Sequence, residues 1–294
     1  MRAFTLGSYN WQGCGVGDGP DDQLRRQLGL LADVRADAWL FQECEGWRDS
    51  AGQTLFLAEQ ILGLRGFVAA SSPRGGDLAV FVKESAGLRV TAEEHEDGYP
   101  FCHAPIRLGI ATPWPGASFQ LVTAHLAPTS PTIRLAEAEA LAALADDGLV
   151  IAGGSWNALA AADPEPTLTS SKSNYGHRVL DRSAASAIEE SGFADVAAFL
   201  RDLRPTVGHA GGLRYRCDRI YSTFPLEAIV SYEVIEEYEP VSAHRPVVAT
   251  FDIEAAKHPL SSEGSRLALI FQGGWWLPLA VVSWVLVPDF RAGV

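Results

Sequence analysis

Residues 119–159 hold the pattern that decides the fold class, FQLVTAHLAPTSPTIRLAEAEALAALADDGLVIAGGSWNAL. Apolar residues dominate positions 119–126 and again 149–154, as is typical of buried strands. Between them, at about 132–146, alanine and leucine recur at helical spacing. The stretch therefore predicts a strand, a helix and a second strand, which indicates an α/β protein.

The same alternation extends on both sides of this stretch. The sequence predicts further helices at about 21–34, 50–62 and 184–190, and strands near 3–10, 38–42, 66–71, 78–83, 88–92, 106–111, 215–222, 228–235 and 246–253. Many strands with a few helices indicate two sheets packed face to face, with helices outside. Residues 160–177 are rich in proline, serine and threonine, and we expect a loop that borders a functional site.

Length and composition favour one catalytic domain, at residues 1–254, followed by a separate segment at 255–294. The chain has 294 residues, of which 47% are hydrophobic and 20% charged, so it has ample material for a core. The formal net charge of −13 repels nucleic acid, and we therefore expect no broad nucleic-acid binding. A bound metal ion would offset that charge at close range.

The cysteines and the N-terminus indicate a cytoplasmic protein. Cys14, Cys44, Cys102 and Cys217 show no C-x-x-C spacing, so neither a zinc site nor a disulfide framework is predicted. We expect reduced thiols. The chain begins MRAFTLGSYN and enters a strand pattern without the apolar segment of a secretory signal.

The C-terminal segment has a different character. Residues 267–288, LALIFQGGWWLPLAVVSWVLVP, contain no charged side chain, and about 20 apolar residues suffice to span a bilayer. Gly273, Gly274 and Pro278 interrupt a straight helix, although membrane spans tolerate such residues. Three interpretations stay open: a membrane anchor, an apolar appendix that is buried or covered by a partner, and an irregular terminus without function.

Polar side chains recur near the ends of the predicted apolar strands, in six places along the chain. They are Asn10, Gln42 with Glu43, His125, Asn157, Asp218 and His244. Strand ends are where a sandwich of this kind gathers a binding or catalytic site. The order of these residues along the chain therefore predicts a single cleft.

The segments around these residues resemble a known family. They are SYNWQG (8–13), FQEC (41–44), TAHLAP (123–128), GGSWNAL (153–159), RCDRI (216–220) and SAHRPV (242–247). In this order they are similar to the motifs of the endonuclease/exonuclease/phosphatase superfamily, which includes deoxyribonuclease I and neutral sphingomyelinases. The resemblance covers about residues 2–252. It implies a deoxyribonuclease I-like, four-layer α/β/β/α sandwich of two mixed sheets, and hydrolysis of phosphoesters or phosphodiesters.

The resemblance also implies roles for the polar residues. Glu43 would be a ligand of Mg²⁺, with Asn10 as a second one, because this ion selects hard oxygen donors. His125 and His244 would be general acid-base groups, since imidazole titrates near neutral pH. Asp218 would orient His244 by accepting its second ring proton.

Other side chains have both a functional and an ordinary interpretation. Asn157 would contact a phosphate oxygen or the attacking water. Arg178, with Lys172 and Tyr175, would contact the phosphate or lie in a solvated loop. Asp218 could instead pair with Arg219, and Asn10 could only cap a turn. His103, His177 and His209 lie in predicted loops where they could line the cleft, but we favour ordinary polar residues there.

Two positions depart from the family pattern. Ser155 and Ala243 stand where the family has aspartates, one orienting or deprotonating the water and the other at the metal centre. Losing such an acid can cost about 10²–10⁴ in rate. Because both carboxylates are absent, the charge at the site falls by two, and we expect Mg²⁺ to be held weakly or not at all. Three functions stay open: a weakened or repurposed phosphoester hydrolase, a pseudoenzyme that binds an anionic ligand, and a metal-independent histidine enzyme.

Overall fold

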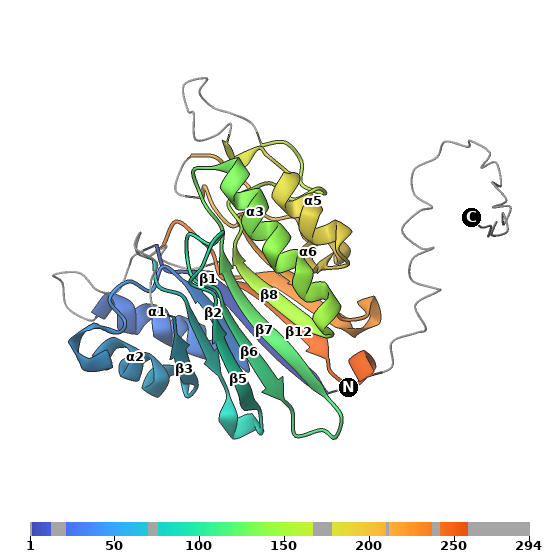
Figure 1. Ribbon diagram of the computed structural model, residues 1–294. Coiled ribbons are helices and arrows are strands. Elements are labelled where there is room, and N and C mark those ends of the chain that lie inside the picture. Colours follow the sequence, from blue (N-terminus) through green and yellow to red (C-terminus); the bar gives the residue numbers. More distant parts are fainter. Residues whose placement is uncertain are drawn as a thin grey trace, which may run out of the picture. The chain divides into compact units, whose positions relative to one another are not determined.

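The computed structural model describes residues 2–12, 22–69, 76–166, 178–209, 212–236 and 242–257 (Figure 1). They form two six-stranded sheets with helices. The apolar stretch 267–288 lies outside the described residues, as does all of the predicted C-terminal segment beyond Lys257. Among the helices that are described, none is both long and apolar enough to span a bilayer.

The first sheet contains both chain-terminal strands of the body. In spatial order its strands are β11 (Ile229–Val234), β12 (Val247–Asp252), β1 (Ala3–Asn10), β2 (Ala38–Gln42), β4 (Ala79–Val82) and β3 (Arg65–Val68). β1 and β2 are parallel, and the other neighbours are antiparallel. The sheet is therefore mixed.

The second sheet is built from the middle of the chain. Its order is β5 (Arg89–His95), β6 (Ile106–Ala111), β7 (Ser118–His125), β8 (Val150–Ser155), β10 (Asp218–Ser222) and β9 (Ala194–Asp195). Only β7 and β8 are parallel, and α3 connects them. The strand, helix and strand predicted for residues 119–159 are thus confirmed.

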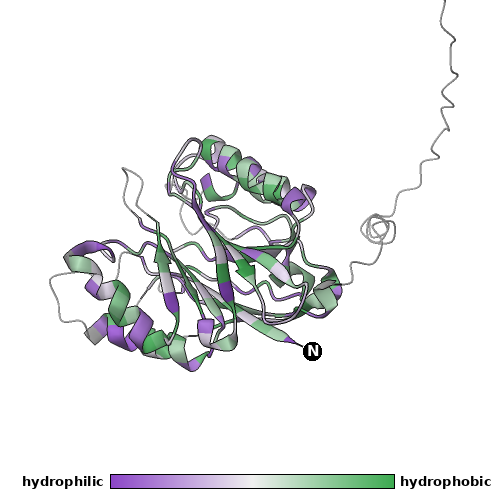
Figure 2. Ribbon diagram, turned by 60° about the horizontal axis from the view of Figure 1, so that its bottom comes forward, coloured by the Kyte–Doolittle hydropathy of each residue, from purple (hydrophilic) through white to green (hydrophobic). Residues whose placement is uncertain are grey.

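Helices cover the outer face of each sheet. They are α1 (Asp22–Asp33) and α2 (Asp49–Leu62) on the first sheet, and α3 (Pro131–Ala142) and α5 (Ser183–Glu190) on the second. The short helix α6 (Val196–Phe199) instead lies beside β10 and β11, with Val196 in the core between the sheets. Single 3₁₀ turns lie at Glu84–Ala86, Ala143–Asp147, Leu226–Ala228 and Ala255–Lys257. Leu28 of α1 packs with Trp39 and Phe41 of the first sheet, and Leu141 of α3 packs with Val122 of the second. Figure 2 shows hydrophobic and hydrophilic residues side by side on the helices, as expected when one face is buried.

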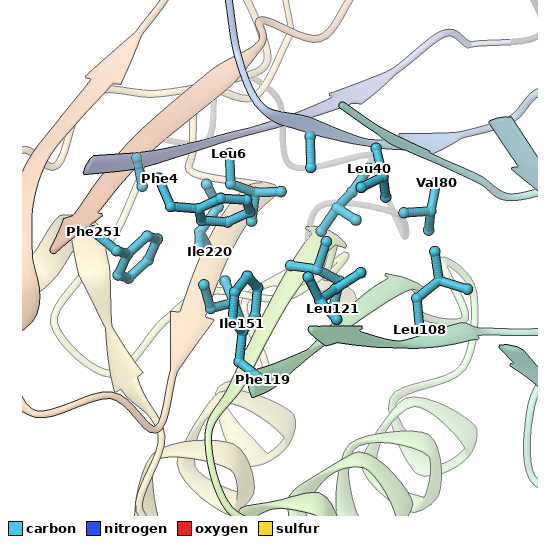
Figure 3. Packing of buried hydrophobic residues seen from close by; sticks show 14 of the residues in the cluster. Phe4, Leu6, Leu40, Val80, Leu108, Phe119, Leu121, Ile151, Ile220 and Phe251 are labelled. Carbon is cyan, nitrogen blue, oxygen red and sulfur yellow. The ribbon is translucent and has the colours of Figure 1, made fainter. Parts of the chain in front are cut away.

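The main core lies between the two sheets. Leu6, Leu40 and Val80 of the first sheet meet Leu121 and Ile151 of the second, and all are buried (Figure 3). Fully burying such a side chain stabilises the fold by roughly 1.5–3 kcal/mol. Two inner sheets with helices on both outer faces make the predicted four-layer α/β/β/α sandwich.

Two local predictions need comment. The helix predicted for 132–146 ends at Ala142, and residues 143–147 form a tighter 3₁₀ turn. Asp146 and Asp147 disfavour a longer helix, because carboxylates are unfavourable at the negative end of the helix dipole. Cys44, Cys102 and Cys217 form no disulfide among the described residues, and Cys14 lies outside them.

Candidate active site

The strand pairings bring the predicted polar residues to one edge of the sandwich. Asn10 lies opposite Gln42 in the parallel β1–β2 pair, and both His125 and Asp218 lie opposite Ser155. Across the two sheets, the Asn10 Nδ2 donates to the Ser155 Oγ at 3.0 Å. Residues from five strand ends therefore share one site.

A cavity of about 330 Å³ opens at this edge. Its lining residues are Asn10, Gln12, Glu43, Glu45, Gly76, His103, His125, Pro128, Asn157 and His244. Five of them, Asn10, Glu43, His125, Asn157 and His244, are predicted site residues. The sequence prediction of one shared cleft is thus matched by the geometry.

Asp218 lies beneath the cavity and holds His244. The carboxylate is fully buried and accepts the His244 Nδ1 proton, at 2.8 Å to Oδ2 and 3.0 Å to Oδ1. Ser155 Oγ donates to Oδ1 at 2.6 Å, and Thr206 Oγ1 donates to Oδ2 at 2.7 Å. Because Nδ1 carries the proton to Asp218, Nε2 is the ring nitrogen left for chemistry.

The alternative of an Asp218–Arg219 ion pair is not what the structure contains. Arg219 Nη1 donates to the Ala158 carbonyl oxygen at 2.9 Å, and its guanidinium lies over the Tyr221 ring. Adjacent residues of a strand point to opposite faces, so Asp218 and Arg219 face away from each other.

Electrostatics favour the protonated form of His244. Burial lowers the pKa of this ring, but the charge of Asp218 and its hydrogen bond act more strongly together, and the net pKa is raised. The predicted orienting contact of Asp218 is therefore present and carries an electrostatic effect.

His125 has a contrasting environment. Its ring stacks on His103, with centroids 4.2 Å apart and planes 7° from parallel. Burial lowers its pKa well below the ordinary range, and the nearby His103 and His244 lower it further. The Nε2 lies 3.7 Å from Glu43 Oε1, and Nδ1 is buried without a hydrogen-bond partner among the described residues. His125 is therefore neutral near pH 7.

The amide of Asn10 is already engaged in the structure. Its Nδ2 also donates to Glu43 Oε1 at 3.0 Å, and its Oδ1 accepts the Gln12 backbone N–H at 2.7 Å. The turn contact and the site contact thus coexist. Gln12, Glu43 and Asn157 have positive φ angles of 53°, 57° and 51°, a conformation that costs non-glycine residues of order 1–3 kcal/mol each. Such strain clusters at functional sites.

The remaining predicted residues divide into two groups. Asn157 is buried, donates from Nδ2 to the Leu126 carbonyl oxygen at 2.8 Å and lines the cavity. The Arg178 side chain is exposed and lies outside the cavity lining, so its phosphate contact stays a prediction. Lys172, Tyr175 and His177 lie outside the described residues. His209 Nε2 contacts the Ser242 carbonyl oxygen at 3.2 Å.

The favoured interpretation of His103 as an ordinary polar residue was wrong, and the alternative that it lines the cleft is what the structure contains. Its Nδ1 donates to the His125 carbonyl oxygen at 2.9 Å. Only its position just before the strand that pairs with β7 could have signalled this. Gln12 and Glu45 also line the cavity, although neither was predicted as a site residue; Gln12 lies within the SYNWQG segment, and Glu45 directly follows FQEC.

Because Ser155 and Ala243 replace the two family aspartates, few carboxylates remain at the site to bind a metal ion. Ser155 is buried within the hydrogen-bond network, and Ala243 offers its backbone N–H to Gln12 Oε1 at 2.7 Å. Mg²⁺ needs only one or two carboxylates when it keeps water ligands. The Glu43 carboxylate, partly exposed in the cavity, fits such a weakly held ion.

A trio of ligand-type residues does not fit a metal. Cys217, Asp218 and His244 have ligand atoms within 4.8 Å of one another. Burial and the charge of Asp218 raise the pKa of Cys217 to about 12, so the thiol stays protonated. Both Asp218 oxygens already accept hydrogen bonds. Asp218 and His244 belong to the hydrogen-bonded pair described above, whereas Cys217 Sγ donates to Asn157 Oδ1 at 3.5 Å.

Comparisons with solved structures agree with the fold. Humanized TDP2 from D. rerio superposes with a TM-score of 0.62 at 18% identity, over 85% of this chain and 99% of that one. The catalytic domain of human nocturnin, with bound sulfate, gives 0.60 at 13%, over 85% and 93%. An AP endonuclease from Archaeoglobus fulgidus gives 0.60 at 17%, over 85% and 99%. At identities this low, the superpositions show a shared fold and nothing more specific.

The sequence itself matches a family description. No curated protein matches this chain. A model of the Endonuclease/Exonuclease/phosphatase family matches residues 7–244, which include every lining residue of the cavity. The chain therefore belongs to the endonuclease/exonuclease/phosphatase family.

Proposed function

We propose that the protein hydrolyses a phosphoester, with His244 as its general base and acid and with a weak metal contribution. The observation that carries the proposal is the Asp218–His244 pair, whose carboxylate is fully buried and whose imidazole lines the cavity. A carboxylate behind an imidazole sets its tautomer and stabilises the imidazolium that forms when it takes a proton. Family membership supports the reaction class.

His244 would act at the cavity through Nε2. In this scheme it takes a proton from the attacking water or returns one to the leaving group, a contribution of about 10²–10⁴ in rate. His125 is held neutral and can accept a hydrogen bond, while the Asn157 amide lies beside it in the lining. The two histidines thus present opposite proton affinities to one bound group.

A divalent cation, when bound at Glu43, would neutralise charge on a phosphate oxygen. The residues present favour a weak contribution, because Ser155 and Ala243 supply no carboxylate. We therefore expect Mg²⁺ or Mn²⁺ to stimulate the activity modestly.

A small phosphorylated or otherwise anionic molecule is the substrate class that we propose. The net charge of −13 opposes binding to long nucleic acid. None of the ten described lining residues is lysine or arginine, so the cavity itself offers no fixed cation for a phosphate backbone.

The direct test is turnover of bis(4-nitrophenyl) phosphate with Mg²⁺, with Mn²⁺ and with EDTA. We expect slow turnover by the natural sequence and a loss of about 10²–10⁴ in His244→Ala. The control is His95→Ala, because His95 lies exposed on β5 and contacts Glu93. Equal rates in His244→Ala and the natural sequence would contradict the proposal.

A second candidate is a binding protein without turnover, favoured by the loss of both family acids at Ser155 and Ala243. It predicts no activity under any metal condition, together with calorimetric binding of inorganic phosphate that His244→Ala removes. The metal-independent enzyme predicts a third outcome, in which EDTA leaves turnover unchanged.

A further inference from the structure

The stacked pair of His103 and His125 is assembled from two separate segments. His125 ends β7, whereas His103 lies before β6. A hydrogen bond between them runs from the His103 ring to the His125 backbone. The His125 ring has no partner at Nδ1 among the described residues, so no orienting carboxylate holds it as Asp218 holds His244. The antiparallel β6–β7 pairing ends at Ile106 and Thr123, so the segments beyond it depend on other contacts for their relative position.

Glu137 of α3 contacts both segments. Its Oε1 accepts the Cys102 backbone N–H at 2.7 Å, and its Oε2 accepts the Ala127 backbone N–H at 2.6 Å. Cys102 directly precedes His103, and Ala127 lies two residues after His125. One carboxylate therefore ties together the backbone on both sides of the stack.

Because Glu137 is buried, its carboxylate depends on these two hydrogen bonds. The side chain has no exposed surface. Burial raises the pKa of its carboxyl, while the hydrogen bonds from Ala127 and Cys102 act in the opposite direction. A buried carboxylate is costly unless its oxygens are satisfied, and here each oxygen has a backbone donor.

Arg134, one turn earlier on α3, supports the same loop. Its guanidinium is buried and donates to the Ala127 carbonyl oxygen at 2.9 Å and to the Arg178 carbonyl oxygen. Ala127 is thus held through both its N–H and its C=O. Residues three apart on a helix lie on one face, so Arg134 and Glu137 reach the loop together.

We propose that Glu137 is a positioning residue, which joins the backbone beside His103 and His125 and so sets the stacked imidazoles in the cavity wall. The effect on catalysis rests on the proposed function, but the effect on the two rings does not. Glu137 is not among the residues that line the cavity, so it would act through the backbone segments that it holds.

The test is Glu137→Gln, with Glu139→Gln as the matched control on the exposed side of α3. Glutamine has the same shape but one acceptor oxygen, so it can accept only one of the two backbone N–H groups. By NMR, we expect exchange of the Cys102 or Ala127 amide to become at least about tenfold faster. The ring C–H signals of His103 and His125 should shift, and kcat should fall by about tenfold with KM within twofold.

Glu137→Asp keeps the charge and serves as the second variant if glutamine prevents folding. Its oxygens lie one methylene further back and cannot reach both donors, so the ring signals must again shift. Unchanged ring signals in a folded variant whose amides exchange faster would overturn the proposal, because Glu137 would then only anchor α3. If the natural sequence shows no turnover, the proposed function fails, and the ring signals still decide this inference.

Discussion

The two sides of the cavity hold their histidines by opposite means. On one side, His244 rests on the buried carboxylate of Asp218, which three side chains contact. On the other, His125 rests on the flat face of His103 and on no carboxylate at Nδ1. The pKa of His244 is raised and that of His125 is lowered. The same side chain thus favours its protonated or its neutral form according to what lies behind it.

Of the predicted changes, Asp218→Asn should have the largest effect on this contrast. The amide can donate to His244 Nδ1 and so favour the wrong tautomer, while the shape is kept. We expect turnover to fall by about 10²–10⁴, or roughly 3–5 kcal/mol in activation free energy. Steady-state kinetics on bis(4-nitrophenyl) phosphate measure this. Asp147→Asn, at the opposite end of β8, is the control, and a similar loss there would refute the assignment.

Ser155→Asp tests whether the His244 side of the cavity tolerates a second buried carboxylate. Ser155 is fully buried and its Oγ lies 2.6 Å from Asp218 Oδ1, so a second carboxylate there would repel the first. We expect a loss of about 3 kcal/mol of folding free energy in EDTA. Denaturant unfolding measures it, with Ser155→Asn as the neutral control.

Adding Ala243→Asp to that variant should change the metal requirement. With both acids restored near Glu43, we expect Mn²⁺ to recover stability and to make turnover metal-dependent. A double variant that gains neither stability nor activity with Mn²⁺ would show that Glu43 does not hold a metal.

His103→Ala examines the other side, where stacking replaces the carboxylate. Such ring pairs contribute about 0.5–1.5 kcal/mol, so we expect the free energy of unfolding to fall by about 1 kcal/mol. His103→Phe keeps the stack but not the Nδ1 hydrogen bond, and should lose less. Thermal unfolding would distinguish the two, and equal losses would mean that the hydrogen bond to the His125 backbone matters more than the stack.

The pH dependence of stability should be the smallest effect, and it compares the two histidines directly. Because the pKa of His244 is raised, its contribution to stability is full below about 6.5, the unfolded value, and is lost as pH rises through the folded pKa. His125 has the opposite sign: its stability is present above about 6.5 and is lost as pH falls towards the folded pKa. NMR titration should show His244 titrating above His125. His125→Asn should lose less stability than the natural sequence between pH 7 and pH 5.

Much of the fold could be predicted because it depends on local periodicity. The strands Ala3–Asn10 and Ala38–Gln42 and the helix Ser183–Glu190 were predicted to within one residue. The helix predicted for 132–146 was too long, because charge at its C-terminal end is a weaker signal than alanine spacing. Residues 160–177 were predicted as a loop, and 167–177 of it lie outside the described residues.

The site was predicted less evenly. Asn10, Glu43, His125, Asn157 and His244 lie at or near strand ends, a position visible in the sequence, and they line the cavity. His103 lies within the loop between β5 and β6, and Glu137 lies inside an alanine-rich helix among other charged residues. Their importance depends on which backbone comes near them after folding, and no local pattern encodes that.

The sequence by itself determined the family, the sandwich and the order of the polar strand ends, because apolar periodicity and short motifs are properties of neighbouring residues. Only the tertiary structure decided that Asp218 pairs with His244 rather than Arg219, that His103 stacks on His125, and that the two histidines differ in pKa. Hydrogen bonds across sheets and the loss of water around a charge exist only when distant segments have packed together.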